Sequence, residues 1–263
     1  MHSKEEKLEA LGKLLDIMDE LRAKCPWDRE QTFESIRNNT IEETYELADA
    51  ILEKDLINIK KELGDLLLHI VFYSKMGSET GDFDIGDVAE AICEKLIFRH
   101  PHVFGDTDVK NNPENVKKNW EELKIKEGNH SVLGGVPPSL PALIKANRIQ
   151  EKARAVGFDW EERYQVWDKV EEELKELKTE IDRMDKNRTS AEFGDLFFSL
   201  VNAARLYDVD PETALEQTNR KFISRFNYLE SKTLKQGRKL KHMTLDEMNA
   251  IWEEAKGKEG RSF

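Results

Sequence analysis

Acidic residues recur in the sequence at spacings that place pairs of carboxylates on one face of a helix. Residues three apart share a helix face, so Glu173 and Glu176 project together, as do Glu192 and Asp195 further along the chain. The 15 residues between Glu176 and Glu192 are enough for the rest of one helix, a turn and the start of an antiparallel helix. Folding these two helices together brings four carboxylates to one place.

Such a group of carboxylates has the chemistry of a metal site. Partly desolvated carboxylates repel one another and titrate upward unless a cation neutralises them. Ligation by oxygen alone suits Mg²⁺ or Mn²⁺, and the absence of His and Cys at these positions argues against zinc. A single acidic helix face is usually just a solvent-exposed surface. Two acidic motifs in this order and spacing favour a metal site. Gly194, which lacks a side chain, is expected to let another helix or a ligand approach closely.

The same motifs occur twice in the chain, at an offset of 130 residues. The N-terminal copies are Glu43, Glu46, Glu62 and Asp65. Three more blocks repeat in the same order, namely Trp27-Asp28 with Phe158-Asp159, Lys95 to Arg99 with Lys221 to Arg225, and Trp120 with Trp252. The order of these blocks predicts a duplicated domain. We expect an N-terminal domain over 1–127, a linker rich in Gly and Pro over 128–141, and a C-terminal domain over 142–263.

Composition favours helices and limits the classes of partner. Gly and Pro are sparse, Leu, Glu and Lys dominate, and no alternating run of β-branched residues stands out, so we predict an all-α protein with four main helices in each half. A formal charge of −12 disfavours binding to nucleic acid or to anionic membranes. The longest apolar stretch is far shorter than a membrane span, and Cys25 and Cys93 form no CxxC pair, so we expect a cytoplasmic protein.

The order and spacing of these motifs resemble the MazG family of nucleoside triphosphate pyrophosphohydrolases over nearly the whole chain. The resemblance rests on EExxE, E-hydrophobic-GD, the K-x-x-x-R helix and the terminal W-E-E. It implies two tandem helical bundles of the all-α NTP pyrophosphatase type and a homodimer. It also implies Mg²⁺-dependent hydrolysis of NTPs and dNTPs to the monophosphate and pyrophosphate, with broad base tolerance and a housecleaning role in the nucleotide pool.

The resemblance also implies roles for individual residues. The metal ligands are expected to be Glu173, Glu176, Glu192 and Asp195, with Glu43, Glu46, Glu62 and Asp65 in the N-terminal half. Triphosphate contacts are expected from Lys169, Arg188, Lys221 and Arg225, with Glu172 and Asp195 beside the substrate and Trp252 on the nucleoside. A weaker second substrate site is expected at Lys95, Arg99 and Trp120. Because Glu172 lies beside the ligands, it could accept the proton of the attacking water, or it could be a solvated surface residue.

The two halves differ in the cations near their acidic motifs. Lys169 corresponds to Asn39, and Arg188 corresponds to Asn58. A triphosphate carries several negative charges, so the loss of two cations is expected to weaken its binding to the N-terminal half. Lys60 and Lys61 could compensate in part.

The first acidic helix of the N-terminal half also carries a second apolar stripe, made by Ile41, Tyr45, Ala48 and Leu52. A helix that is apolar on two sides needs two packing partners, which suggests a subunit interface. We therefore expect the C-terminal domain to be the main catalytic half and the N-terminal domain to be more structural and dimerising.

Three alternatives remain at this stage. A narrow-specificity relative of the same superfamily would act on dUTP, dCTP or phosphoribosyl-ATP. A catalytically silent module would bind nucleotide without hydrolysing it. A di-iron carboxylate bundle would need Glu-x-x-His pairs, and the sequence has Asp65 and Asp195 where that histidine would stand, which disfavours it.

Overall fold

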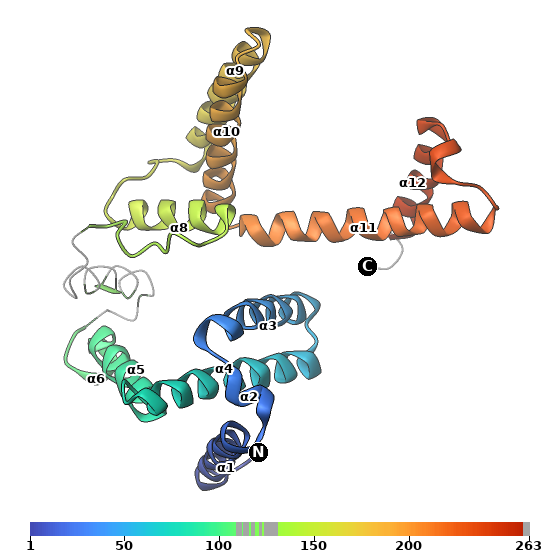
Figure 1. The fold of residues 1–263 in the computed structure, drawn as a ribbon. Helices are drawn as coiled ribbons and strands as arrows, with labels where there is room; N and C mark the ends of the chain where they lie inside the picture. The colour runs from blue at the N-terminus through green and yellow to red at the C-terminus, as the bar shows by residue number, and fades with distance from the viewer. Residues whose placement is uncertain (109–111, 113–115, 117–118, 121–122, 124–130, 260–263) are drawn as a thin grey trace. The chain divides into compact units, whose positions relative to one another are not determined.

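A computed structural model of the chain describes residues 1–108, 112, 116, 119–120, 123 and 131–259. Every regular element within these residues is a helix, and none of them forms a strand, which confirms the predicted all-α fold (Figure 1). Packing contacts divide the chain into two compact units, Met1–Asn111 and Asn112–Phe263. Each unit has its own apolar clusters, as a duplicated helical domain requires.

The first unit is built around the pairing of two long helices. Its helices are α1 Lys4–Lys24, α2 Pro26–Glu30, α3 Phe33–Glu53, α4 Leu56–Thr80, α5 Ile85–Arg99 and α6 Pro101–Phe104. Helix α3 packs along α4, and α1 also packs against α4. Met18 of α1, Ile36 of α3 and Phe72 of α4 meet in one buried cluster. The apolar contacts of this cluster hold the α3–α4 pair in place.

The second unit has five helices of at least 14 residues among its described residues. Its elements are α8 Ala142–Ala155, η1 Arg163–Gln165, α9 Val166–Asp182, α10 Lys186–Leu206, α11 Pro211–Lys235, η2 Leu240–His242 and α12 Leu245–Glu259. The count exceeds by one the four main helices predicted for this half. Helix α9 packs along α10, α12 packs on α11, and α8 contacts both α10 and α11.

Both acidic helix pairs are closed by the same tight turn. Lys54 and Met184 occupy the left-handed region with φ of 57° and 56°, and the next residue in each case caps the following helix. Asp55 accepts from the amides of Ile57 and Asn58, and Asp185 accepts from the two equivalent amides. The repeat therefore extends to backbone conformation, although neither turn contains the glycine that usually marks one.

The predicted linker, 128–141, falls within the second compact unit. Its first three residues lie outside the described residues, and the remainder leads directly into α8. Its role as a linker stays a prediction. Among the described helices, none combines the length and apolar character that crossing a membrane requires.

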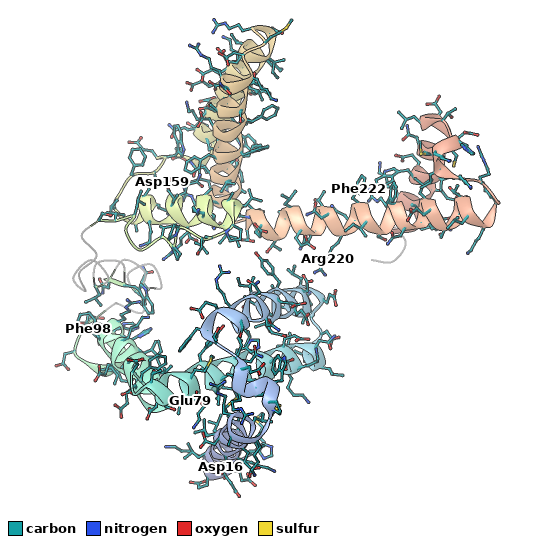
Figure 2. All side chains as sticks on the ribbon, viewed as in Figure 1. Asp16, Glu79, Phe98, Asp159, Arg220 and Phe222 are labelled. Atoms are coloured by element: carbon teal, nitrogen blue, oxygen red, sulfur yellow. The ribbon has the colours of Figure 1, made fainter. Side chains whose placement is uncertain are left out.

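A partly buried ion pair links the end of α10 to the segment after α8. The Arg205 guanidinium donates to the carboxylate of Asp159 at 3.1 and 2.5 Å, and it also contacts Asn202 (Asp159 is labelled in Figure 2). Burial alone would raise the pKa of Asp159, but the hydrogen bonds from Arg205 and from the Trp160 amide outweigh it and hold this pKa below its ordinary value. The charged pair therefore stabilises this junction at neutral pH.

We predict that Arg205→Ala lowers the free energy of unfolding by about 2–4 kcal/mol, because Asp159 loses its main partner while it stays partly buried. Urea denaturation followed by circular dichroism measures the change. As a control, Lys256→Ala removes an exposed pair with Glu253, and its effect should stay within about 0.5 kcal/mol. Equal effects of the two substitutions would contradict a stabilising role for the Arg205–Asp159 pair.

Candidate functional site

The two helix pairs bring the predicted acidic motifs together. In the second unit, carboxylate oxygens of Glu173, Glu176 and Glu192 all lie within 4.8 Å of one another. In the first unit the same holds for Glu43, Glu62 and Asp65. We call these groups, each completed by its fourth predicted ligand, the C-terminal and the N-terminal acidic cluster. The fourth members are Asp195 and Glu46.

Burial and mutual repulsion raise the pKa of one carboxyl group in each cluster. Partial burial and the neighbouring charges of Glu176, Asp195 and Glu173 raise the pKa of Glu192 above its ordinary value. Burial, followed by the charges of the other N-terminal cluster carboxylates, raises the pKa of Glu43 in the same way. Each cluster therefore carries an electrostatic cost that a bound cation would relieve.

Burial also leaves a carboxylate oxygen without a partner. Glu62 and Glu173 are only 5% and 6% exposed. The Oε2 atom of Glu62 is out of contact with solvent and accepts no hydrogen bond within the described chain. An unsatisfied buried oxygen is costly, and a divalent cation would satisfy it. With oxygen donors only, the clusters fit Mg²⁺ or Mn²⁺; the individual ligand roles stay predictions.

Each cluster contains one close lysine, but the two lysines come from different helices. In the second unit, Nζ of Lys169 on α9 lies 2.7 Å from Glu173 and 3.1 Å from Glu172. In the first unit, Nζ of Lys61 on α4 lies 3.0 Å from Glu62 and 4.0 Å from Asp65. The carboxylates therefore keep a partial counter-charge without a metal. Lys61 is one of the two lysines that were expected to compensate for missing cations.

Arg188 lies in the first turn of α10, near the acidic end of the α9–α10 pair. Its Nε is 3.5 Å from Asp185, the residue that caps this helix, and most of its side chain is exposed. In the first unit Asn58 takes this place and donates to Asp55 at 2.9 Å. Arg188 also stands four residues before Glu192 on α10, so both lie on the same face of this helix, and the corresponding N-terminal position is neutral.

The remaining predicted substrate contacts form a second group, on α11 and α12. The rings of Phe222 and Trp252 lie 5.0 Å apart, and the Arg225 guanidinium lies 5.8 Å from the Trp252 ring centre (Phe222 is labelled in Figure 2). Lys221 is exposed on the same helix. Trp252 is half-buried, so it packs against Phe222 while part of its surface stays open. Within this unit the acidic group belongs to the α9–α10 pair and the aromatic and basic group to the α11–α12 pair.

The predicted second substrate site in the N-terminal half is only partly described. Lys95 and Arg99 lie on α5, four residues apart, with Lys95 exposed and Arg99 half-buried. Trp120 is helical and half-buried, but it belongs to the second compact unit. The roles of these residues stay predictions.

Sequence reasoning missed Glu180, which lies one helical turn beyond Glu176. Glu180 is 8% exposed; one of its oxygens accepts from Arg183 at 2.6 Å, while its Oε2 has no partner within the described chain. Its charge contributes to the raised pKa of Glu192. The signal was present, because Glu173, Glu176 and Glu180 step by three and four along one face. The N-terminal half has Ala50 at this position.

The expected close approach at Gly194 is not made within the described chain. A Cβ atom added at Gly194, or at the equivalent Gly64, would meet nothing within 4 Å. Each glycine directly precedes a cluster aspartate, and the space where its own side chain would stand is open.

Comparisons with known proteins agree with the motifs. Residues 31–104 and 164–229 each match the MazG nucleotide pyrophosphohydrolase domain. The chain is 46% identical to the nucleoside triphosphate pyrophosphohydrolase/pyrophosphatase MazG of Thermotoga maritima over 93% of this chain and 94% of the relative. It is 42% identical to the nucleoside triphosphate pyrophosphohydrolase of Escherichia coli K12 over 95% of this chain and 98% of the relative. A similarly named protein of Mycobacterium tuberculosis is 35% identical over 57% of this chain and 46% of the relative.

We predict that Glu192→Gln raises the melting temperature of the protein in EDTA at neutral pH. A carboxyl group with a raised pKa costs stability when it is charged, and this cost falls as pH drops toward the ordinary glutamate value. The amide removes the charge at every pH. The same variant should lose the extra stabilisation that Mg²⁺ gives to the unsubstituted protein.

Glu253→Gln is the control for this measurement, because Glu253 is exposed on α12. This substitution should change neither the melting temperature in EDTA nor the stabilisation by Mg²⁺. A lower melting temperature for Glu192→Gln in EDTA would mean that the charge of Glu192 stabilises the protein without metal, which contradicts the repulsion described above.

Proposed function

Because the chain belongs to the MazG family of nucleotide pyrophosphohydrolases, we propose that it hydrolyses nucleoside triphosphates to the monophosphate and pyrophosphate in the presence of Mg²⁺. The observation that carries this proposal is the meeting of Glu173, Glu176 and Glu192, with oxygens within 4.8 Å of one another. Glu173 is buried, Glu192 is half-buried and Glu176 is exposed, so the group is partly desolvated, and a bound cation would relieve the repulsion within it.

Glu173, Glu176, Glu192 and Asp195 would hold Mg²⁺, with Mn²⁺ as a substitute. When bound there, the ion supplies positive charge for the phosphate oxygens. Lys169 would turn from Glu173 toward the triphosphate, and Arg188, which faces solvent, would contact it from the turn of the α9–α10 pair. These cations stabilise the charge that builds up as pyrophosphate leaves.

No protein nucleophile is needed for this reaction, since water can attack the α-phosphorus directly. Glu172 is exposed beside the cluster and paired with Lys169, so its carboxylate could take the proton of that water. Its position favours this role over that of an isolated surface residue, because one lysine joins it to the buried Glu173.

The group on α11 and α12 is suited to the nucleoside and to the phosphates. Trp252 offers a partly open aromatic face, and stacking on such a face depends little on the identity of the base. This supports broad base tolerance and a housecleaning role over narrow action on dUTP, dCTP or phosphoribosyl-ATP. Lys221 and Arg225, four residues apart on α11, would contact phosphate oxygens.

We also propose that the working protein is a homodimer. Apolar side chains remain exposed along α3, α10 and α11, where a second copy would cover them. Those exposed by 40% or more include Ile41, Tyr45, Phe193, Phe197, Phe222 and Ile223. Dimerisation would also let α11 and α12 of one copy approach the acidic cluster of the other. A cytoplasmic location and a lack of nucleic-acid binding stay predictions from the sequence.

Product analysis tests the reaction. A panel of NTPs and dNTPs with Mg²⁺ should yield monophosphate and pyrophosphate, without a diphosphate intermediate, at rates that differ little between bases. EDTA should abolish turnover, and Mn²⁺ should restore part of it. Release of orthophosphate and a diphosphate as first products would overturn the proposal, strong preference for one nucleotide would favour the narrow-specificity alternative, and binding without turnover would favour the silent module.

The two halves should contribute unequally to turnover. We predict that Glu176→Ala lowers kcat/KM by about 10–100-fold, because it removes a predicted metal ligand from the half that carries Lys169 and Arg188. The matched change Glu46→Ala, in the half where Asn39 and Asn58 replace these cations, should cost less than about threefold. Equal losses, or a larger loss for Glu46→Ala, would show that the N-terminal half does the work.

A further inference from the structure

The N-terminal acidic cluster contains a lysine that has no counterpart in the C-terminal cluster. Lys61 directly precedes Glu62 on α4, whereas Ala191 precedes Glu192 at the corresponding place on α10. The ammonium of Lys61 lies 3.0 Å from Oε1 of Glu62 and 4.0 Å from Asp65. A lysine ammonium is charged at neutral pH, so Lys61 brings one positive charge into contact with two members of this cluster.

Lys169 in the C-terminal half is not equivalent to Lys61. It contacts the predicted ligand Glu173 but also Glu172, which lies outside the ligand set. If Glu173 binds a metal ion instead of Lys169, Lys169 keeps Glu172 as an acidic partner. Both acidic contacts of Lys61, Glu62 and Asp65, are themselves predicted ligands. A metal ion bound by Glu62 and Asp65 would deprive Lys61 of both partners. It would also lie close to the positive charge of Lys61, which repels it.

We propose that Lys61 is a resident counter-ion of the N-terminal acidic cluster, which partly neutralises its carboxylates without metal and disfavours a divalent cation there. Glu62 is buried, and Lys61 is the neighbour that satisfies one of its two oxygens. The Lys61 side chain is 62% exposed, so it can swing into solvent. Solvent screening and this freedom reduce the repulsion, and we expect a weakening of metal affinity of about tenfold rather than its loss.

The inference rests on the proposed cation role of the acidic clusters, and it explains a difference between them. Both clusters retain the four predicted ligands, so the ligand set alone gives no reason for unequal metal binding. The identity of one residue, Lys61 or Ala191, then sets which half is metal-loaded at a given Mg²⁺ concentration. The N-terminal half becomes a self-neutralised structural copy of the C-terminal one.

Mn²⁺ titration followed by electron paramagnetic resonance tests this in the full chain, because free Mn²⁺ gives a signal that bound Mn²⁺ largely loses. The N-terminal cluster is isolated by Glu176→Gln with Glu192→Gln, and the C-terminal cluster by Glu46→Gln with Glu62→Gln. In the first background, Lys61→Met should tighten Mn²⁺ binding about tenfold. In the second, Ala191→Lys should weaken it about tenfold.

Lys60→Met is the matched control, because it removes the same charge from the adjacent position and should change the N-terminal affinity less than about threefold. Circular dichroism confirms that each variant is folded. Unchanged or weaker N-terminal binding in Lys61→Met overturns the inference even if the C-terminal cluster binds Mn²⁺ tightly. Equal effects of Lys60→Met and Lys61→Met also overturn it. Failure of both clusters to bind Mn²⁺ in any background would overturn the proposed function as well.

Discussion

Repulsion between carboxylates that face one another across a two-helix pair is the constraint on which this structure depends. The tight turns at Lys54 and Met184 fold each pair back on itself, so acidic residues at similar distances before and after the turn must meet. Apolar clusters on the same helices hold them there. Because the carboxylates cannot move apart without exposing this apolar surface, the repulsion is relieved by protonation or, at neutral pH, by a nearby positive charge.

The two halves meet this constraint in different ways. In the N-terminal cluster, Lys61 contacts two of the carboxylates. The position that corresponds to Glu180 is Ala50, which carries no charge. The C-terminal cluster has Lys169 at its edge and a further buried carboxylate, Glu180, that adds negative charge. The C-terminal half therefore has the greater need for an external cation, which fits its proposed catalytic role. Duplication allowed one copy to become self-neutralised while the other kept an open site.

Much of this arrangement could be predicted from the sequence, because it follows from helical spacing. Carboxylates three residues apart share a face in any helix, and the repeat showed that the pattern was not accidental. The turn residues could not be predicted, since Lys54 and Met184 adopt a left-handed conformation that sequence rules assign to glycine. Glu180 was overlooked because burial depends on how α9 packs on α10. The grouping of Arg225 and Trp252 with Phe222 on α11 and α12 likewise depends on which helices pack together.

The most direct test of the central claim, that these clusters are cation sites of unequal strength, is anomalous diffraction from crystals of the full chain soaked in Mn²⁺. The account predicts a strong anomalous peak among Glu173, Glu176, Glu192 and Asp195, and a weaker peak or none among the equivalent N-terminal carboxylates. A map with no peak at the C-terminal cluster, or with its strongest peak beside Lys61, would contradict the account.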